Sequence, residues 1–269
     1  MDAQEPGVDT EDPCNVAQNA RQFLFRTHWT HIPAEQINNG EERMMSTDED
    51  ARKTIHFIKD YCHHHGDKNT RSLTIADAFA CLGGNTHSFS IYFKDVMAYE
   101  QDEKRYEGLV QNVRAYPGQA EKTTVTVKCQ DCCAPGGILD TYHDAVFMDP
   151  PWVTTTTQNI DSKVFIDALH LATRIAEAKT AKYIFLKLPL EAKFPDEFAA
   201  LRQHLSGKWS DIQTHTITRH KRRGQQPSYT IVCAYQKAPS AAHTSSEALN
   251  TMSLLLTQLH ACQFFHDIY

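Results

Sequence analysis

The sequence Asp149-Pro150-Pro151-Trp152 follows a short apolar run and is the most specific chemical signal in the chain. Two successive prolines remove two backbone donors and stiffen the turn, which leaves carbonyl oxygens beside the Asp149 carboxylate. Such acceptors can hold the two N–H groups of an exocyclic aromatic amine and orient its lone pair. The Trp152 indole offers a flat surface on which a nucleobase can stack. The motif predicts catalytic roles for Asp149, Pro150 and Trp152; a stiff structural turn is the alternative interpretation.

A second motif runs from Asp77 to Asn85 and contains the glycine pair Gly83 and Gly84. Glycines between a strand and a helix let a ligand approach the backbone closely. Asn85 can cap the helix, and the Asp77 carboxylate can meet a cationic group of a ligand. The glycines do not have the GxGxxG spacing of a dinucleotide-binding loop, so the pattern does not predict a nicotinamide or flavin enzyme.

Two further carboxylates end predicted strands. Glu100 stands 23 residues after Asp77, and a carboxylate at about this distance in a β-α-β unit typically holds a ribose diol. Asp131, which follows the next strand, is suited to the edge of an adenine ring. Each of these signals is common by itself, and their value lies in occurring in order along one chain.

The elements that must position these residues alternate between strands and helices. Alternating apolar runs predict strands at 73–77, 96–100, 122–129, 145–149 and 183–188, followed by a hairpin of 212–218 and 229–235. Helical spacing predicts helices at 85–93, 102–113, 162–179 and 196–205, and Ser46 with Glu49 forms a capping box for an earlier helix. This order predicts an α/β fold with a mostly parallel seven-stranded sheet, helices on both faces and a C-terminal antiparallel hairpin. Such sheets bind ligands at the carboxyl ends of their strands.

Composition sets outer limits on function. The chain has 269 residues and a net charge of −6, and its first 50 residues carry 11 acidic and 3 basic side chains. No apolar run approaches the roughly 20 residues of a membrane span, and the acidic start does not resemble a signal peptide. We therefore expect no membrane association or secretion, and a location in the nucleus or cytoplasm. The eight cysteines are expected to be free thiols. A zinc site around Cys129, Cys132 and Cys133 is the less favoured interpretation, so no metal is predicted.

Taken together, these motifs resemble those of the Rossmann-like class I methyltransferases that use S-adenosylmethionine to modify an amine on a base. Residues 46–237 are most similar to the trimethylguanosine synthase family, the RNA cap guanine-N2 methyltransferases. In that family the aromatic residue of the Pro-Pro-Trp motif stacks on the 7-methylguanine of the cap, which is the role implied for Trp152. The resemblance implies that S-adenosylmethionine binds at Asp77, Phe79, Cys81, Gly83, Gly84, Asn85, Glu100, Asp131 and Asp149.

The sequence departs from the family at several points. The family usually has glycine at Cys81, serine at Asp149 and two glycines at Val153 and Thr154. Asp-Pro-Pro-aromatic motifs also occur in adenine-N6 and ribosomal guanine-N2 methyltransferases, so these activities remain alternatives. A methyltransferase-fold subunit that binds nucleic acid without activity is a third hypothesis. RNA is the expected substrate, with DNA as the alternative. The residues expected to line the substrate side are Trp152, Thr154, Arg219, Lys221, Arg222 and Arg223.

The chain is predicted to contain four parts. These are an acidic disordered leader at 1–20, a helical extension at 21–65, the methyltransferase domain at 66–237, and a linker with an amphipathic helix at 238–269. The apolar stripe of the last helix is expected to pack on its own domain; docking of a partner protein is the alternative.

Overall fold

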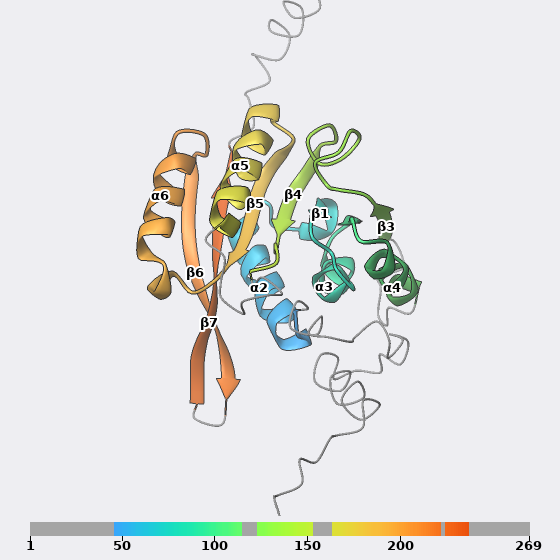
Figure 1. Ribbon diagram of the computed structural model, residues 1–269, viewed down its shortest axis with the longest axis horizontal. Helices are drawn as coiled ribbons and strands as arrows, with labels where there is room; N and C mark the ends of the chain where they lie inside the picture. Colours follow the sequence, from blue (N-terminus) through green and yellow to red (C-terminus); the bar gives the residue numbers. More distant parts are fainter. Residues whose placement is uncertain (1–45, 115–122, 153–162, 222–223, 237–269) are drawn as a thin grey trace, which may run out of the picture. The chain divides into compact units, whose positions relative to one another are not determined.

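The computed structural model describes residues 46–114, 123–152, 163–221 and 224–236. Its centre is a seven-stranded sheet in the order β3-β2-β1-β4-β5-β7-β6 (Figure 1). The strands are β1 (Thr74–Asp77), β2 (Asp95–Glu100), β3 (Thr124–Cys129), β4 (His143–Met148), β5 (Ala181–Leu188), β6 (Asp211–Lys221) and β7 (Gly224–Tyr235). The seven strands and the antiparallel C-terminal pair predicted from the sequence are confirmed.

Strands β1 to β5 are parallel, and β7 runs antiparallel to both β5 and β6. The chain builds outward from β1 to β3 on one side; on the other it passes from β4 to β5, then forms the edge with β6 and returns with β7 between β5 and β6. The order therefore reverses between β1 and β4, whose registers place Asp77 opposite Phe147. Ligands of open α/β sheets bind at this switch point, outside the carboxyl ends of the strands. Asp77 and Asp149 lie there because they end β1 and follow β4.

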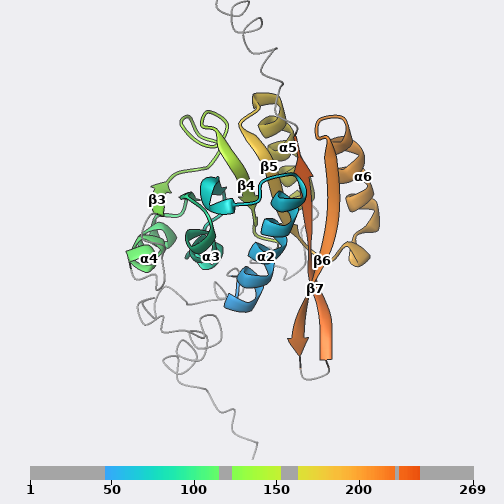
Figure 2. The same ribbon diagram turned by 180° about the vertical axis from the view of Figure 1, so that it is seen from behind.

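Helices cover both faces of the sheet (Figures 1 and 2). One face carries α2 (Asp48–His64), α3 (Gly84–Tyr92) and α4 (Glu103–Arg114), and the other carries α5 (Lys163–Ala178) and α6 (Pro195–Ser206). Short 3-10 turns lie at Thr70–Ser72 and Glu191–Lys193. The helices predicted within the described residues are therefore found, with ends that differ from the prediction by one or two residues.

The central strands are apolar on both faces because helices bury both sides. In β4, Val146 belongs to the apolar cluster beneath α5 and α6, whereas Ala145 and Phe147 belong to the cluster beneath α2 and α3. Alternate residues of a strand point to opposite faces, so each strand contributes to two cores. This packing fixes the register of β1 and β4, and with it the positions of the carboxylates at their ends.

The β6–β7 hairpin is longer than predicted. The sequence predicted that residues 219–228 form a loop, but β6 continues to Lys221 and β7 begins at Gly224. Pairing of β5 with β7 ends at Leu188 opposite Thr230, whereas pairing of β6 with β7 continues to Lys221 opposite Gly224. The basic part of the hairpin thus extends beyond the carboxyl end of β5, as Figure 1 shows.

The start of α2 also differs from the prediction. Thr47, not Ser46, is the N-cap: its hydroxyl oxygen accepts a hydrogen bond from the amide N–H of Asp50, and its O–H donates to the Asp50 carboxylate. Ser46 lies one residue earlier, where its side chain turns to Asp149. The prediction of Ser46 as N-cap was wrong because serine and threonine both suit this position. The contact of Ser46 with Asp149 leaves Thr47 to cap the helix.

The predicted leader, the front of the helical extension, and the C-terminal linker and helix lie outside the described residues. None of the described helices combines the length and the apolar character needed to cross a membrane.

Candidate active site

The Asp149 carboxylate lies in a buried polar cluster at the carboxyl end of β4. Its Oδ2 atom accepts three hydrogen bonds: from Lys187 Nζ at 2.6 Å, from Ser46 Oγ at 3.2 Å and from Asn85 Nδ2 at 3.2 Å. The side chains of Lys187 and Asp149 are 6% and 10% exposed. Four separate elements meet here: the start of α2, the first turn of α3, the end of β4 and the end of β5.

Within the described part of the chain, no donor bonds to the other oxygen of Asp149, Oδ1. That oxygen keeps some contact with solvent, since it is absent from the set of completely buried polar atoms without partners. Asp149 therefore has one anchored oxygen and one acceptor available to a ligand.

Pro150 is buried and Pro151 is exposed, so the stiff turn begins at the edge of the core. The Trp152 side chain that follows is partly buried and contacts both apolar clusters. Its indole N–H donates to the carbonyl oxygen of Lys187 at 3.1 Å. The Lys187 ammonium lies 5.6 Å from the indole centroid, and the Tyr229 ring lies at 6.3 Å with a 52° tilt. The indole is thus anchored along β5, and base stacking on its exposed part stays a prediction.

Asp77 is completely buried at the end of β1. Its Oδ2 atom accepts a 2.7 Å hydrogen bond from Thr86, whereas Oδ1 is buried with no partner among the described residues. Burial is the main cause that raises the pKa of Asp77 to about 7, and the negative charge of Asp149 adds to it. An orphaned carboxylate oxygen beside a glycine turn is a suitable acceptor for a cationic ligand group.

The turn after β1 has a backbone conformation that lets another group lie close to its main chain. Cys81 and Gly83 have positive φ angles of 50° and 95°, in the left-handed region where only glycine is unstrained. A Cβ atom on Gly84 would lie 2.6 Å from the carbonyl oxygen of Ser46, so the start of α2 passes directly over this glycine. The glycines were predicted to let a ligand approach, but at Gly84 the group that lies close is the protein's own backbone. Ligand contact at this turn stays a prediction. Phe79, in the same turn, is partly buried against the apolar cluster.

Glu100 ends β2 next to this turn. Its Oε2 atom accepts the amide of Cys81 at 3.0 Å, and its Oε1 atom accepts the amide of Asp102 and the Arg105 guanidinium. A carboxylate offers about four lone-pair sites. Described residues use three of them, which leaves capacity on Oε2 for a hydroxyl donor such as a ribose. The Glu100–Arg105 ion pair explains why this acid tolerates an exposure of only 7%.

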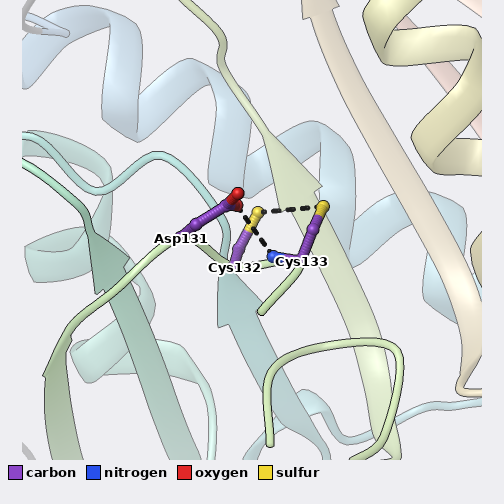
Figure 3. Close-up of side chains that lie close together, drawn as sticks. All are labelled: Asp131, Cys132 and Cys133. Carbon is purple, nitrogen blue, oxygen red and sulfur yellow. Dashed lines mark hydrogen bonds between the residues drawn. The ribbon is translucent and has the colours of Figure 1, made fainter. Parts of the chain in front are cut away.

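Asp131 follows β3, and its carboxylate accepts the amide of Cys133 at 2.9 Å. The two neighbouring sulfur atoms, of Cys132 and Cys133, lie 3.8 Å apart (Figure 3). A hydrogen bond from the Cys132 thiol lowers the pKa of Cys133 to about 7. The potential ligand atoms of the three residues lie within 4.8 Å of one another. The hydrogen bond from the Cys133 amide to Asp131 and the contact between the two thiols hold these atoms together.

Cys129, the third cysteine of the less favoured zinc interpretation, does not join this group. It is exposed on β3, and His65 bonds to Asp211 at 3.0 Å. All described cysteines, Cys129 and Cys132 included, are free thiols.

The residues predicted for the substrate side are only partly described. Thr154, Arg222 and Arg223 lie outside the described residues. The backbone of Arg219 and Lys221 belongs to β6, opposite Gln226 and Gly224. This places both residues on the hairpin that extends past the site, so their contact with substrate stays a prediction.

Sequence reasoning missed two members of the cluster, Lys187 and Ser46. A signal for Lys187 was available: a lysine inside the apolar strand Tyr-Ile-Phe-Leu-Lys-Leu is rarely buried unless it has a partner. No comparable signal marked Ser46, because its contact with Asp149 spans 103 residues.

The arrangement fits S-adenosylmethionine. The unsatisfied Oδ1 of Asp77 suits a cationic group, Oε2 of Glu100 has capacity for a ribose hydroxyl, and Asp131 is exposed beside them. All three residues lie at the carboxyl ends of neighbouring strands, β1, β2 and β3.

Comparisons with known proteins agree with this fold. The human methyltransferase 10 domain containing protein superposes with a TM-score of 0.56 and 13% identity, covering 86% of this chain and 100% of the human chain. A METTL16 methyltransferase domain gives a TM-score of 0.56 and 14% identity, with coverage of 86% and 100%. Identity this low shows the fold alone.

In sequence, the chain is 28% identical over 158 residues to an uncharacterised protein of Acanthamoeba polyphaga mimivirus, covering 56% of this chain and 59% of the viral protein. Residues 72–224 match the RNA cap guanine-N2 methyltransferase family, which is more than half of the chain and includes the glycine turn, Glu100 and the Asp149 motif. The chain therefore belongs to the RNA cap guanine-N2 methyltransferases, a family of S-adenosylmethionine-dependent RNA methyltransferases.

Proposed function

We propose that this chain transfers a methyl group from S-adenosylmethionine to an exocyclic amine of an RNA nucleobase, with guanine N2 of a 5′ cap as the preferred target. The observation that carries this proposal is the Asp149 carboxylate, held at the switch point with Oδ2 anchored and Oδ1 available. Membership of the cap guanine-N2 family supports the choice of base.

The cofactor would supply an electrophilic methyl group on a sulfonium: the amine nitrogen attacks this carbon, the carbon–sulfur bond breaks, and S-adenosylhomocysteine leaves. Asp77, Glu100 and Asp131 are proposed to hold its cationic, ribose and adenine portions. The backbone around Gly83 and Gly84 forms the turn beside it. These roles use the acceptor capacity left on Asp77 and Glu100.

Asp149 acts on the amine. Its free oxygen accepts one N–H of the exocyclic group, which orients the nitrogen lone pair and stabilises the positive charge that develops as the N–C bond forms. The proton then leaves the methylated nitrogen, and Asp149 Oδ1 is proposed to accept it. The Pro150–Pro151 turn keeps this carboxylate in place, and the exposed part of Trp152 supports the base. Alignment of two reactants by such contacts can contribute roughly 7–11 kcal/mol.

The extended hairpin is proposed to contact RNA outside the catalytic centre. Arg219, Lys221, Arg222 and Arg223 cluster at its tip in the sequence, and pairing of β6 with β7 continues there beyond β5. Phosphate contacts of this kind position the nucleic acid without reading its bases.

The test uses methyl-labelled cofactor with matched capped RNA, uncapped RNA and DNA. We expect transfer to capped RNA, inhibition by a cap dinucleotide, and loss of transfer in Asp149→Asn, which keeps the side-chain shape. Binding of S-adenosylhomocysteine by calorimetry should persist in that variant.

Preferential labelling of uncapped RNA or DNA would instead support adenine-N6 or ribosomal guanine-N2 methylation. Full transfer by both Asp149→Asn and Asp149→Ala would refute the role of this carboxylate. Absence of S-adenosylhomocysteine binding by the unmodified protein would favour a subunit without activity.

A further inference from the structure

Lys187 stands inside β5, where most neighbouring side chains are apolar and buried. Its side chain is 6% exposed. Removing an ammonium group from water is strongly unfavourable unless partners replace the lost hydration. The position of Lys187 therefore requires specific partners, and these identify what it does.

The Lys187 ammonium has partners on several sides. Nζ bonds to Asp149 Oδ2 at 2.6 Å and also donates to Ser46 Oγ, which itself bonds to the same carboxylate oxygen. Nζ further lies 4.9 Å from the Tyr229 ring centroid and 5.6 Å from that of Trp152. Such cation–π contacts are stronger in a desolvated site.

The aromatic wall behind this lysine is itself fixed. The Tyr229 hydroxyl lies 2.9 Å from the Thr54 hydroxyl and donates to the carbonyl oxygen of Asp50 at 3.1 Å. The Trp152 indole donates to the carbonyl oxygen of Lys187. The ammonium consequently sits between two anchored rings and a carboxylate, and has little freedom to move.

The arrangement controls which oxygen of Asp149 faces a substrate. The torsion that rotates an aspartate carboxylate is soft and has broad preferences. Three donors on Oδ2 oppose that rotation and leave Oδ1 as the available acceptor. Lys187 contributes the shortest of the three bonds and the only charged one.

We propose that Lys187 is a positioning residue for methyl transfer: it anchors Asp149 through Oδ2, so that Oδ1 meets the exocyclic amine of the base. This inference rests on the proposed function and deepens it. It also assigns Lys187 a neutralising role, because its charge balances that of Asp149 in a site that must also take up a cationic cofactor. The competing explanation is purely structural, with the ion pair holding the start of α2 against β4 and β5.

The experiment compares Lys187→Met, Lys187→Arg and the surface control Lys208→Met. Lys208 also forms a 2.6 Å ion pair, with Glu177, but on the surface. Each protein is assayed for kcat and KM on the RNA that the unmodified protein methylates best, for S-adenosylhomocysteine affinity by calorimetry, and for Tm.

We expect Lys187→Met to lower kcat about 100-fold, the order of loss that a misplaced reacting group produces. KM and S-adenosylhomocysteine affinity should stay within about threefold, since the residue does not hold either ligand. Lys187→Arg keeps the positive charge but replaces the compact ammonium by a planar guanidinium, so its kcat should fall about tenfold. Lys208→Met should match the unmodified protein.

A kcat within threefold of the unmodified value in a folded Lys187→Met protein overturns the positioning role. If Lys187→Met does not fold, Lys187→Arg decides, and a kcat within twofold overturns it. An unmodified protein that binds S-adenosylhomocysteine but methylates no nucleic acid refutes the proposed function, and the inference fails with it. The two failures are distinguished by the activity of the unmodified protein.

Discussion

Replacing Asp77 by asparagine tests the most strongly perturbed acid of the site. Burial raises the pKa of Asp77 from 3.8 to about 7. The folded protein therefore binds a proton at Asp77 more tightly than the unfolded chain does. The stabilisation that this causes is fully present below pH 3.8 and is lost as the pH rises to about 7. Asparagine keeps an acceptor for Thr86 but carries no charge, so it removes this pH dependence.

The size of the effect follows from linkage. At pH 5 the unfolded chain has already released nearly all of its Asp77 proton, whereas the folded protein releases it only near pH 7. Integration from about pH 5 to pH 8 gives a loss of about 3 kcal/mol in the free energy of unfolding that is specific to Asp77. Urea denaturation of the unmodified protein and Asp77→Asn at several pH values measures it as a difference, in which other titrating groups cancel.

The expected result is that the stability difference between the unmodified protein and Asp77→Asn falls by about 3 kcal/mol from pH 5 to pH 8. Cofactor affinity should move in the opposite sense: ionised Asp77 attracts a cationic ligand, so S-adenosylmethionine should bind the unmodified protein more tightly at pH 8 than at pH 6. Asp77→Asn should show no such change. A stability difference that does not vary with pH would refute the assigned burial of this charge.

Three further changes test other parts of the site. Gly84→Ala should lower the free energy of unfolding by about 1–3 kcal/mol, because the new Cβ would meet a backbone carbonyl at 2.6 Å. The control is Gly207→Ala, whose new Cβ would meet nothing within 4 Å. Equal denaturation curves for the two variants would contradict the close approach at Gly84. Trp152→Leu should raise KM for RNA about 5- to 150-fold, as expected for the loss of roughly 1–3 kcal/mol of stacking. Calorimetry should show that cofactor affinity is unchanged. An unaltered KM would exclude stacking of the base on this indole. Replacing Arg222 and Arg223 by glutamine should make RNA binding less sensitive to salt, because two phosphate contacts are lost. The slope of log K against log salt concentration should fall by about 1.4 for single-stranded RNA. Fluorescence anisotropy at several salt concentrations measures this slope, and an unchanged slope would show that the hairpin does not contact RNA.

Local patterns were sufficient for the fold and for the order of its motifs. The apolar runs of β1 and β4 are continuous because helices bury both faces, and this is visible in the residues themselves. The sequence pattern alone places Asp77 and Asp149 at one edge of the sheet, because parallel strands bring their carboxyl ends together. Family membership is likewise a property of the sequence.

The tertiary structure alone decided how these carboxylates are used. Ser46 and Lys187 reach Asp149 across 103 and 38 residues, and no local pattern encodes contacts between such distant positions. In the folded chain Thr47, and not Ser46, caps α2, so the Ser46 hydroxyl is available to bond to Asp149. Which oxygen of Asp149 is anchored, and which is left for a substrate, depends on donors that three other elements deliver to one point, and only the packing of those elements on the sheet determines it.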